Sequence, residues 1–315
     1  MKRPLVSAII AVYNGERYIR DAVESILADE LRDIEVVVVD DGSTDATREV
    51  LSHIADDRIV VLENGVNRGV AASFNRAMEN ATGGYIAFLG ADDINLPHRL
   101  RTQFEFMEKN RDIGLLGSWM KTFGSRRRVM RYPERDADIK MANLFTCSIG
   151  HPSVVIRTEP FRRHGLLFDE TLNAGVDYEL WSRAEAAGIV FHNLPEVLVR
   201  YRTHAGQVTS RRREEQLNND RMVKRYLLGR LGIAPTEEEL ALHCDMMFRK
   251  TAITDTADLP RYEAWAHKLL EANRRTRIYP AGFEEYLRQW MRDAYASCAA
   301  RSGQMTMAPG FWTRG

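Results

Sequence analysis

Four apolar runs in the first ninety residues, each followed by a helical pattern, restrict this chain to a small set of folds. The runs lack polar alternation, which is typical of strands covered on both faces. They span residues 5–13, 34–39, 59–62 and 85–89. Strands that alternate with helices in this way join into a mostly parallel sheet through right-handed crossovers. The sequence therefore predicts an α/β fold with a Rossmann-like, mostly parallel sheet and helices on both faces.

The rest of the chain divides into a continuation of this sheet and a purely helical region. Further strand-like segments lie at 113–120, 153–156 and 197–201. Helical patterns alone follow, at residues 211–231, 236–248, 260–272 and 283–299. Thr236 and Glu239 form a capping-box pattern for the second of these helices. We expect an α/β domain over 1–210, a C-terminal helical appendage over 211–300 and a mobile tail over 301–315.

Composition excludes several classes of protein. Lysine plus arginine total 44, and aspartate plus glutamate also total 44, so the formal net charge is zero. No overall electrostatic field therefore attracts nucleic acid to the protein. The three cysteines form no Cys-x-x-Cys pair, so neither a zinc site nor a disulfide framework is indicated. No secretory signal is present, and the apolar runs are shorter than the roughly 18 residues that cross a bilayer. We expect a cytoplasmic protein that binds no nucleic acid and whose membrane contact, if any, is peripheral, at the inner face.

Pairs of adjacent carboxylates follow two of the predicted strands. Asp40 and Asp41 follow the second strand, and Asp92 and Asp93 follow the fourth. In open α/β sheets ligands bind beyond the carboxyl ends of the strands, and parallel strands bring these ends to one edge. Carboxylate oxygens at that edge suit Mg²⁺ or Mn²⁺. The two pairs therefore predict a binding site at this edge of the sheet.

Each pair also has a purely structural interpretation. Ser43 is a natural N-cap for the second helix, and Asn95 with Pro97 matches the start of another. The first turn reads YNGERY rather than Gly-x-Gly-x-x-Gly, so the dinucleotide fingerprint of many oxidoreductases is absent. A bound nucleotide would be held in another way.

Seven segments of the chain form an ordered set of motifs. They are VSAIIAVYNGERYI (6–19), VVVDDGSTD (37–45), NRGVAASFN (67–75), YIAFLGADD (85–93), HPSVVIR (151–157), VDYELWSRA (176–184) and VRYRTHAGQVTS (199–210). Together they resemble the family 2 glycosyltransferases, which are inverting enzymes of the GT-A fold that use nucleotide-sugar donors. Each motif is weak alone, but seven in the family's order, over about residues 4–210, make the resemblance specific.

The resemblance implies a nucleotide site at the first carboxylates. Asp41 would accept a hydrogen bond from the base, usually uracil, and Tyr13 would lie near the ring. A carboxylate suits uracil because the base presents an N–H donor between two carbonyl acceptors. Asp92 would approach the ribose and the metal region.

The resemblance also implies a metal site and a catalytic base. Asp93 would coordinate a divalent metal, Mn²⁺ or Mg²⁺, that bridges the donor diphosphate, and His204 corresponds to a C-terminal histidine that approaches the metal. Asp177 corresponds to the base that removes the acceptor's proton. The implied activity is metal-dependent inverting transfer of a sugar from a UDP-sugar to a saccharide or lipid-linked acceptor, in surface polysaccharide or glycolipid synthesis.

Three positions depart from the family pattern. Gly90 replaces a common acid, Val176 stands beside the implied base where an acid or glycine is common, and Phe74 stands where a basic residue is common. Gly90 and Val176 leave open a non-catalytic nucleotide-sugar-binding or scaffold module of the same fold. A receiver-type domain phosphorylated on aspartate is a second alternative, but no lysine follows a later strand and residues 151–210 stay unexplained.

Several of these side chains also have simpler interpretations. Tyr13 and Trp181 could be core aromatics, and His204 taken alone could be a surface histidine. Asp177 could cap its helix. The triplet Arg126–Arg128 is more typical of a solvated hairpin or loop than of a phosphate or lipid contact.

Overall fold

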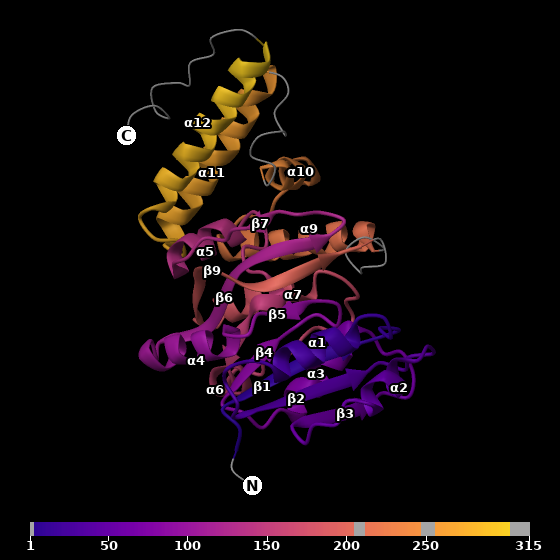
Figure 1. Ribbon diagram of the computed structural model, residues 1–315. Coiled ribbons are helices and arrows are strands. Elements are labelled where there is room, and N and C mark those ends of the chain that lie inside the picture. Colours follow the sequence, from indigo (N-terminus) through magenta and orange to yellow (C-terminus); the bar gives the residue numbers. More distant parts are fainter. Residues whose placement is uncertain (1–2, 205–211, 247–255, 303–315) are drawn as a thin grey trace. The chain divides into compact units, whose positions relative to one another are not determined.

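The computed structural model describes residues 3–204, 212–246 and 256–302 (Figure 1). The chain divides into two compact units, Met1–Ile139 with Ser148–Asn219, and Lys140–Cys147 with Asp220–Gly315. The sequence placed a division at residue 210, whereas the observed one falls inside helix α9 (Arg213–Arg230). Lys140–Cys147, expected in the first domain, belongs to the helical unit. Residues 303–315 of the expected tail lie outside the described residues.

The α/β unit is built on one sheet. Its strands among the described residues are β1 (Val6–Val12), β2 (Ile34–Asp40), β3 (Ile59–Glu63), β4 (Tyr85–Phe88), β5 (Ile94–Asn95), β6 (Ile113–Gly124), β7 (Val129–Met130), β8 (Val155–Arg157) and β9 (Val190–Thr203). The strand order is β3-β2-β1-β4-β8-β6-β9-β5, and β7 pairs with β6. The first four strands are parallel as predicted, and β6 and β9 are parallel too. The pairs made by β5, β7 and β8 are antiparallel, which the sequence did not indicate.

Helices connect the strands of this unit and make up most of the other. They are α1 (Ile19–Leu27), α2 (Thr47–Ser52), α3 (Val70–Asn80), α4 (Arg99–Lys109), α5 (Asp136–Asn143), α6 (Thr158–Arg163), α7 (Val176–Ala186), α9, α10 (Glu237–Asp245), α11 (Leu259–Thr276) and α12 (Phe283–Ser302), with 3-10 turns η1 (His151–Ser153) and η2 (Thr256–Asp258). Every helix that the sequence predicted is present. The short helices α5 and α6 were not predicted.

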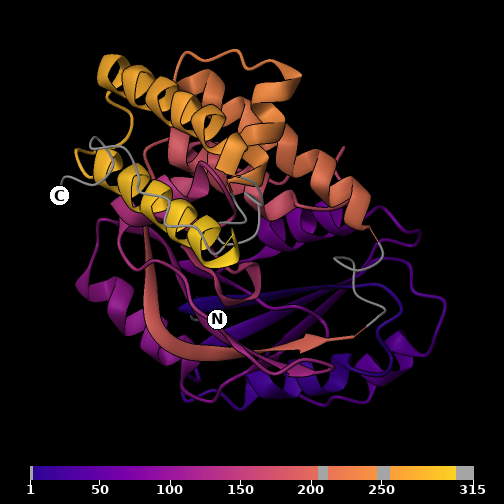
Figure 2. The same ribbon diagram turned by 90° about the horizontal axis from the view of Figure 1, so that it is seen from above.

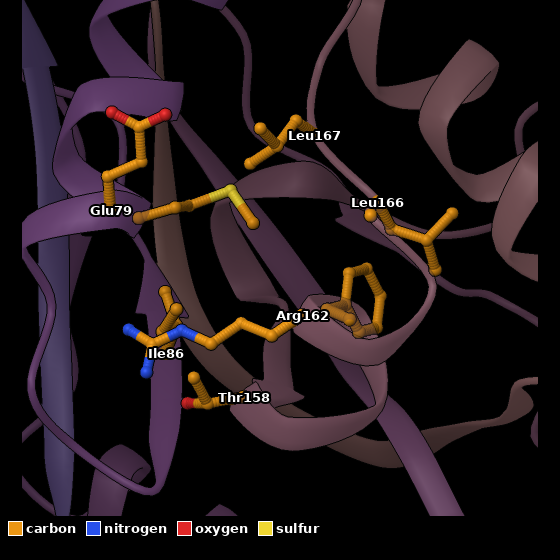
Figure 3. A pocket seen from close by; sticks show the side chains of 9 residues that line it. Glu79, Ile86, Thr158, Arg162, Leu166 and Leu167 are labelled. Carbon is orange, nitrogen blue, oxygen red and sulfur yellow. The ribbon is translucent and has the colours of Figure 1, made fainter.

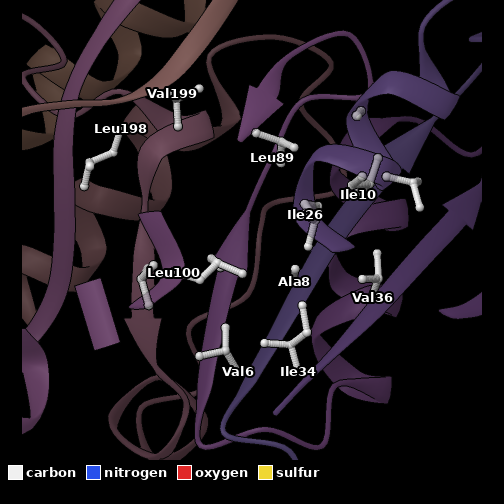
Figure 4. Packing of buried hydrophobic residues seen from close by; sticks show 14 of the residues in the cluster. Val6, Ala8, Ile10, Ile26, Ile34, Val36, Leu89, Leu100, Leu198 and Val199 are labelled. Atoms are coloured by element: carbon white, nitrogen blue, oxygen red, sulfur yellow. The ribbon is translucent and has the colours of Figure 1, made fainter. Parts of the chain in front are cut away.

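Strands β1, β2 and β4 are buried on both faces because helices cover both, whereas the edge strand β3 leaves Val60 and Val61 exposed. Ala8, Ile10 and Val36 point to one face, where Ile26 of α1 packs in the same cluster (Figure 4). The alternate residues face α3, which contacts β1 and β2. Removing one such side chain, as in Ile10→Ala, would destabilise the unit by about 2–5 kcal/mol. Burial on both faces explains the absence of polar alternation.

Two predicted helix starts were wrong. Ser43 does not cap α2, which begins at Thr47; its Oγ instead accepts a hydrogen bond from the backbone N–H of Asn14 at 2.9 Å. Pro97 does not begin α4, which starts at Arg99. The side chain of Asn95 instead donates to Oδ2 of Asp29, just after α1, at 2.9 Å. The capping box of Thr236 in α10 is confirmed.

Strand β9 is much longer than the 197–201 that the sequence predicted. It bends along its length (Figure 2), and its register with β6 shifts at Trp119. Its last residues pair with β5, which follows the Asp92–Asp93 turn, with Arg200 opposite Ile94. The end of β9 therefore lies beside this carboxylate pair.

In the helical unit, α11 and α12 lie side by side (Figures 1 and 2). His243 of α10 is fully buried, with Nε2 2.8 Å from the backbone oxygen of Leu144, and its Nδ1 accepts a hydrogen bond from Trp265 Nε1 at 3.1 Å. The ring of Phe145 stacks on His243 at 4.8 Å. These contacts hold Lys140–Cys147 in this unit. Among the described helices, none has the length and apolar composition to cross a membrane.

Candidate active site

Three of the predicted site loops begin at one edge of the sheet. The register pairs Val12 with Asp40 and Ile9 with Phe88, so β1, β2 and β4 end close together. The loops that follow carry the predicted nucleotide and metal residues, from Tyr13 onward. The expectation that parallel strands bring these residues to one edge is confirmed at the level of the backbone.

Asp93 has an unusual environment for a carboxylate. Its side chain is 1% exposed, and Oδ1 accepts a hydrogen bond from the backbone N–H of Arg202 at 2.8 Å. Oδ2 is buried and has no hydrogen-bond partner within the described residues. Burial, and next the charge of Asp92, raise the pKa of Asp93 well above its usual value, while Arg202 and Arg99 partly oppose this shift. An unpaired buried oxygen with this charge environment favours a bound cation.

Asp92, which is in the same turn as Asp93, contacts His204. Nε2 of His204 is 2.8 Å from Oδ2 of Asp92, and both side chains are about three-quarters buried. The ring of Tyr18 in the loop before α1 is 5.2 Å from the imidazole. His204 is therefore not an ordinary surface histidine. The structure brings Asp92, Asp93 and His204 together, across more than a hundred residues of sequence.

Arg202 links this group, and sequence reasoning missed it. Its Nε donates to the backbone oxygen of Asp92 at 2.7 Å. Its guanidinium lies between the rings of Tyr18, at 4.4 Å, and Phe123, at 4.5 Å. Its position two residues before His204 was the one available signal, since alternate residues of a strand share a face.

Gly90 has no room for a side chain. A Cβ at this position would lie 2.5 Å from Oδ2 of Asp93 and 3.1 Å from Oδ1 of Asp92. The departure at Gly90 therefore has a physical reason here, because the space that an acid would occupy is filled by the two carboxylates that follow.

The donor set at this turn fits a hard divalent cation that shares its ligands with a bound molecule. Among the described residues, no three His, Cys, Asp or Glu side chains are placed to hold a metal by themselves. Mg²⁺ is usually held by one or two carboxylates together with substrate phosphates, which this turn could provide. The unpaired Oδ2 of Asp93 is the atom that such an ion would satisfy.

Asp41 is buried and tied to the loop that precedes α3. Oδ1 accepts from Asn64 Nδ2 at 2.7 Å and from the backbone N–H of Arg68 at 2.8 Å, and Oδ2 accepts from that of Gly69 at 2.9 Å. A carboxylate offers about four acceptor positions, so about one remains for a ligand. Tyr13 is 50% exposed, which excludes the core interpretation of this ring.

Asp177 lies in the first turn of α7, after Gly175 in the left-handed conformation (φ 64°). It is half-buried and is not the N-cap. Burial raises its pKa, although the backbone N–H groups of Tyr178 and Asp177 partly oppose the shift. Within the part of the chain that the structure describes, no hydrogen bond or ion pair joins Asp177 to the other five predicted site residues. A raised pKa makes a carboxylate a stronger base.

Helix α7 is held against the end of β4 by aromatic packing. Trp181 is fully buried, as the core interpretation expected, and its ring centroid is 6.1 Å from that of Phe88. Phe74 is also buried, 5.7 Å from Phe88 and 4.9 Å from His151. Phe74 is therefore a core residue of this unit, which explains why a basic side chain is absent there.

A hollow of about 180 Å³ lies elsewhere in this unit (Figure 3). Its walls come from α3, β4, α6 and the segment after α6, and it includes Glu79 and Arg162 (Figure 3). None of the six predicted site residues lines it. We therefore assign the candidate site to the carboxyl edge of the sheet and not to this hollow.

Comparison with known proteins agrees with this geometry. Residues 7–164 match the sequence profile described as Glycosyl transferase family 2. The chain is 31% identical over 222 residues to UDP-Glc:alpha-D-GlcNAc-diphosphoundecaprenol beta-1,3-glucosyltransferase WfaP of Escherichia coli, covering 70% of this chain and 86% of WfaP.

Solved structures agree at the level of the fold. TarS 1-349 of S. aureus, in complex with UDP, has a TM-score of 0.60 at 17% identity and covers 97% of this chain and 95% of TarS 1-349. The mannosyltransferase PcManGT from Pyrobaculum calidifontis, in complex with GDP-Man and Mn²⁺, has a TM-score of 0.52 at 16% identity over 98% and 77% of the two chains. The fold is the predicted GT-A fold, and the chain belongs to glycosyltransferase family 2.

Proposed function

We propose that this glycosyltransferase transfers a sugar from a UDP donor, with inversion and with a divalent metal, to a hydroxyl group of a saccharide or lipid-linked acceptor. The observation that carries the proposal is the unpaired, buried Oδ2 of Asp93 at the carboxyl edge, beside Asp92 and His204. We place the enzyme in the cytoplasm, in surface polysaccharide or glycolipid synthesis, with peripheral contact to a membrane.

One relative and two proteins of the same fold support the choice of donor and metal. WfaP is named for a UDP-Glc donor and a diphosphoundecaprenol acceptor, and TarS binds UDP. PcManGT binds Mn²⁺ together with its nucleotide sugar. In this chain Tyr13 and the remaining acceptor position of Asp41 would bind the base, with Asp92 near the ribose. Asp93 and His204 would hold the cation, which neutralises negative charge on the leaving diphosphate.

Asp177 supplies the base that the reaction needs. Its carboxylate would take the proton of the attacking acceptor hydroxyl as the new bond to the anomeric carbon forms. A single displacement inverts that carbon, so no second carboxylate nucleophile is required. Burial raises the pKa of Asp177, which makes its carboxylate a stronger base.

Turnover of UDP-sugars by Asp177→Asn tests the base. The amide keeps the shape of the side chain and loses its basicity, so transfer should fall on the order of a hundredfold or more while UDP affinity is retained. Asp112→Asn, at an exposed position, is the matched control. Near-normal transfer by Asp177→Asn would refute this role.

Calorimetric titration with UDP, with and without Mn²⁺, tests the metal site. Asp93→Ala should abolish the metal-dependent part of UDP binding. In turnover assays, His204→Ala should weaken Mn²⁺-supported activity more than Mg²⁺-supported activity, because imidazole is a better ligand for Mn²⁺ than for Mg²⁺. The parent protein in chelator gives the metal-free reference. Metal-dependent UDP binding that survives in Asp93→Ala would contradict the assignment.

A further inference from the structure

A basic surface lies on the β6–β7 hairpin, whose own sequence contains no aspartate or glutamate. Residues 113–131 contain five lysines and arginines and no aspartate or glutamate. Residues 197–204 of β9 and its end add Arg200 and Arg202 and contain no acid, although Arg202 pairs with Asp21 of α1 at 3.4 Å. Because the whole chain has equal numbers of basic and acidic residues, this is a local concentration of positive charge.

Strand pairing gathers several of these charges on one face of the sheet. Lys121 of β6 is in register with Arg200 of β9, and both are exposed. The guanidinium of Arg200 lies 4.5 Å from the ring of Phe123, and that of Arg131 lies 5.3 Å from the ring of Trp119. Alternate strand residues share a face, so these side chains form one layer of cations over aromatic rings.

The turn of the hairpin extends this surface with Arg126–Arg128, all three exposed. Within the described residues none of the three has an ion-pair partner, whereas Arg101, for example, pairs with both Glu30 and Glu105. Lys121 and Arg200 face each other across β6 and β9, and like charges in such a position destabilise a sheet. A bound anionic partner would offset the repulsion between these two side chains.

Hydrogen bonds fix the turn to the candidate active site. The backbone N–H of Arg126 donates to Oγ1 of Thr203 at 2.9 Å, and that of Ser125 donates to the backbone oxygen of Thr203 at 3.0 Å. The next residue is His204, which contacts Asp92. The basic surface and the carboxylate group therefore keep a fixed relation to each other.

We propose that this surface docks the enzyme onto an anionic lipid bilayer, with Arg126–Arg128 among the phosphate headgroups. The side chains are spread along an open hairpin, which suits many phosphate groups at once. Aromatic rings beneath the cations suit the headgroup region, where tryptophan and arginine are favoured. The inference rests on the proposed function, because a lipid-linked acceptor would be presented at the same surface.

Sedimentation of the full-length protein with lipid vesicles tests the proposal. Vesicles of phosphatidylcholine are compared with vesicles that also contain phosphatidylglycerol. The test variant is Arg126→Ser/Arg127→Ser/Arg128→Ser. This variant should fold because backbone hydrogen bonds hold the turn, such as the 2.8 Å bond from the N–H of Thr122 to the backbone oxygen of Arg128. The control, Lys109→Ser/Arg111→Ser/Arg163→Ser, removes equal charge from exposed positions elsewhere on the unit.

The parent should bind only the anionic vesicles, and less so at high salt. The hairpin variant should bind them on the order of a hundredfold more weakly, and the control variant much as the parent does. Equal binding to neutral vesicles, or equal weakening in both variants, would overturn the proposal. Displacement by free glycerol phosphate at the same phosphate concentration would also overturn it, since it would indicate a site for one phosphate.

Transfer to a soluble acceptor separates this inference from the proposed function. The hairpin variant should retain the parent's turnover in solution while it loses vesicle binding. A parent that binds anionic vesicles through the hairpin but transfers no sugar would reject the proposed function and support the docking surface.

Discussion

Asp93 and Gly90 depend on each other at the scale of single residues. A buried oxygen without a hydrogen-bond partner, such as Oδ2 of Asp93, lowers the free energy of unfolding by about 1–3 kcal/mol. A bound cation would remove this loss of stability. Gly90 provides the space in which Oδ2 of Asp93 lies. The glycine that counted against activity in the sequence is therefore part of the proposed site.

Gly90→Ala should displace the Asp93 carboxylate. The added Cβ would lie 2.5 Å from Oδ2, so we expect transfer to fall on the order of a hundredfold, with a stability loss of about 1–3 kcal/mol from overpacking. Gly84→Ala is the control, because its Cβ would meet the oxygen of Leu5 at 3.8 Å. Steady-state kinetics and thermal unfolding measure both variants. Equal, near-parental kinetics in the two would show that Asp93 has room to move.

Arg202→Lys should weaken metal-supported UDP binding by about tenfold or more, as the loss of a residue that orients metal ligands does. Lysine keeps the charge but loses the planar group that contacts Asp92 between two rings. Arg200→Lys is the matched control, because Arg200 also lies over Phe123. Titration of UDP with Mn²⁺ measures the effect. If Arg200→Lys weakens binding equally, Arg202 has no special role.

The sequence predicted the carboxylates of the site, but not the residues that hold those carboxylates in position. Asp92 and Asp93 could be found because an apolar run stops at them, and the sheet's topology then placed them at an edge. Arg202 could not be found in this way, since its contacts with Tyr18 and Phe123 join three elements that are remote in sequence. The hydrogen bonds of Asp41 to the loop before α3 were missed for the same reason.

Among the helices and strands, β9 is an element whose first half could not be predicted from the hydrophobic pattern. Its first half contains His192, Asn193 and Pro195, which are typical of a loop. His192 and Asn193 nevertheless pair with Leu116 and Gly117 of β6, and Pro195 falls at a break in this register. Asn193 is buried and its Nδ2 donates to the oxygen of Pro133 at 2.7 Å. Polar residues with buried partners hide a strand from any pattern based on hydrophobicity, whereas β1, β2 and β4 are apolar along most of their length.

The link between α10 and Lys140–Cys147 should make the helical unit sensitive to acid. Burial lowers the pKa of His243 to about 3, below its unfolded value near 6.5. The unfolded chain therefore binds more protons, and stability should fall by about 1.4 kcal/mol for each pH unit below about 6.5. Denaturant unfolding between pH 7 and pH 5 measures the slope.

His243→Gln should flatten this slope because the amide does not titrate in that range. His164→Gln, at an exposed position, provides the comparison. His151, whose pKa burial also lowers to about 3, should keep a similar slope for the α/β unit. An unchanged slope in His243→Gln would mean that the neutral imidazole does not stabilise the unit.

At the scale of the whole molecule, the sequence predicted the α/β part and the helical part but not how the chain passes between them. Alternating apolar runs and helices were enough for the first four strands, because their order follows from crossover handedness. The assignment of Lys140–Cys147 to the helical unit depends on contacts with residues about a hundred positions later, such as Leu144 with His243. No local pattern contains that information.

A chain shortened to end after residue 219 should lose solubility. Leu144 and Phe145 are buried, and their partners His243 and Tyr286 would be gone. Adding Leu144→Ser/Phe145→Ser to the shortened chain should restore a soluble, monodisperse protein, as measured by size-exclusion chromatography with light scattering. A shortened chain that is monodisperse without these changes would contradict this account.

The same segment sets an order of events during synthesis. Leu144 leaves the ribosome about a hundred residues before His243, a delay on the order of ten seconds at typical elongation rates. Through that interval the nascent chain holds an apolar segment whose binding partner has not yet been made. The stage at which this enzyme most needs a chaperone therefore comes before its last three helices exist, when its sheet is already complete.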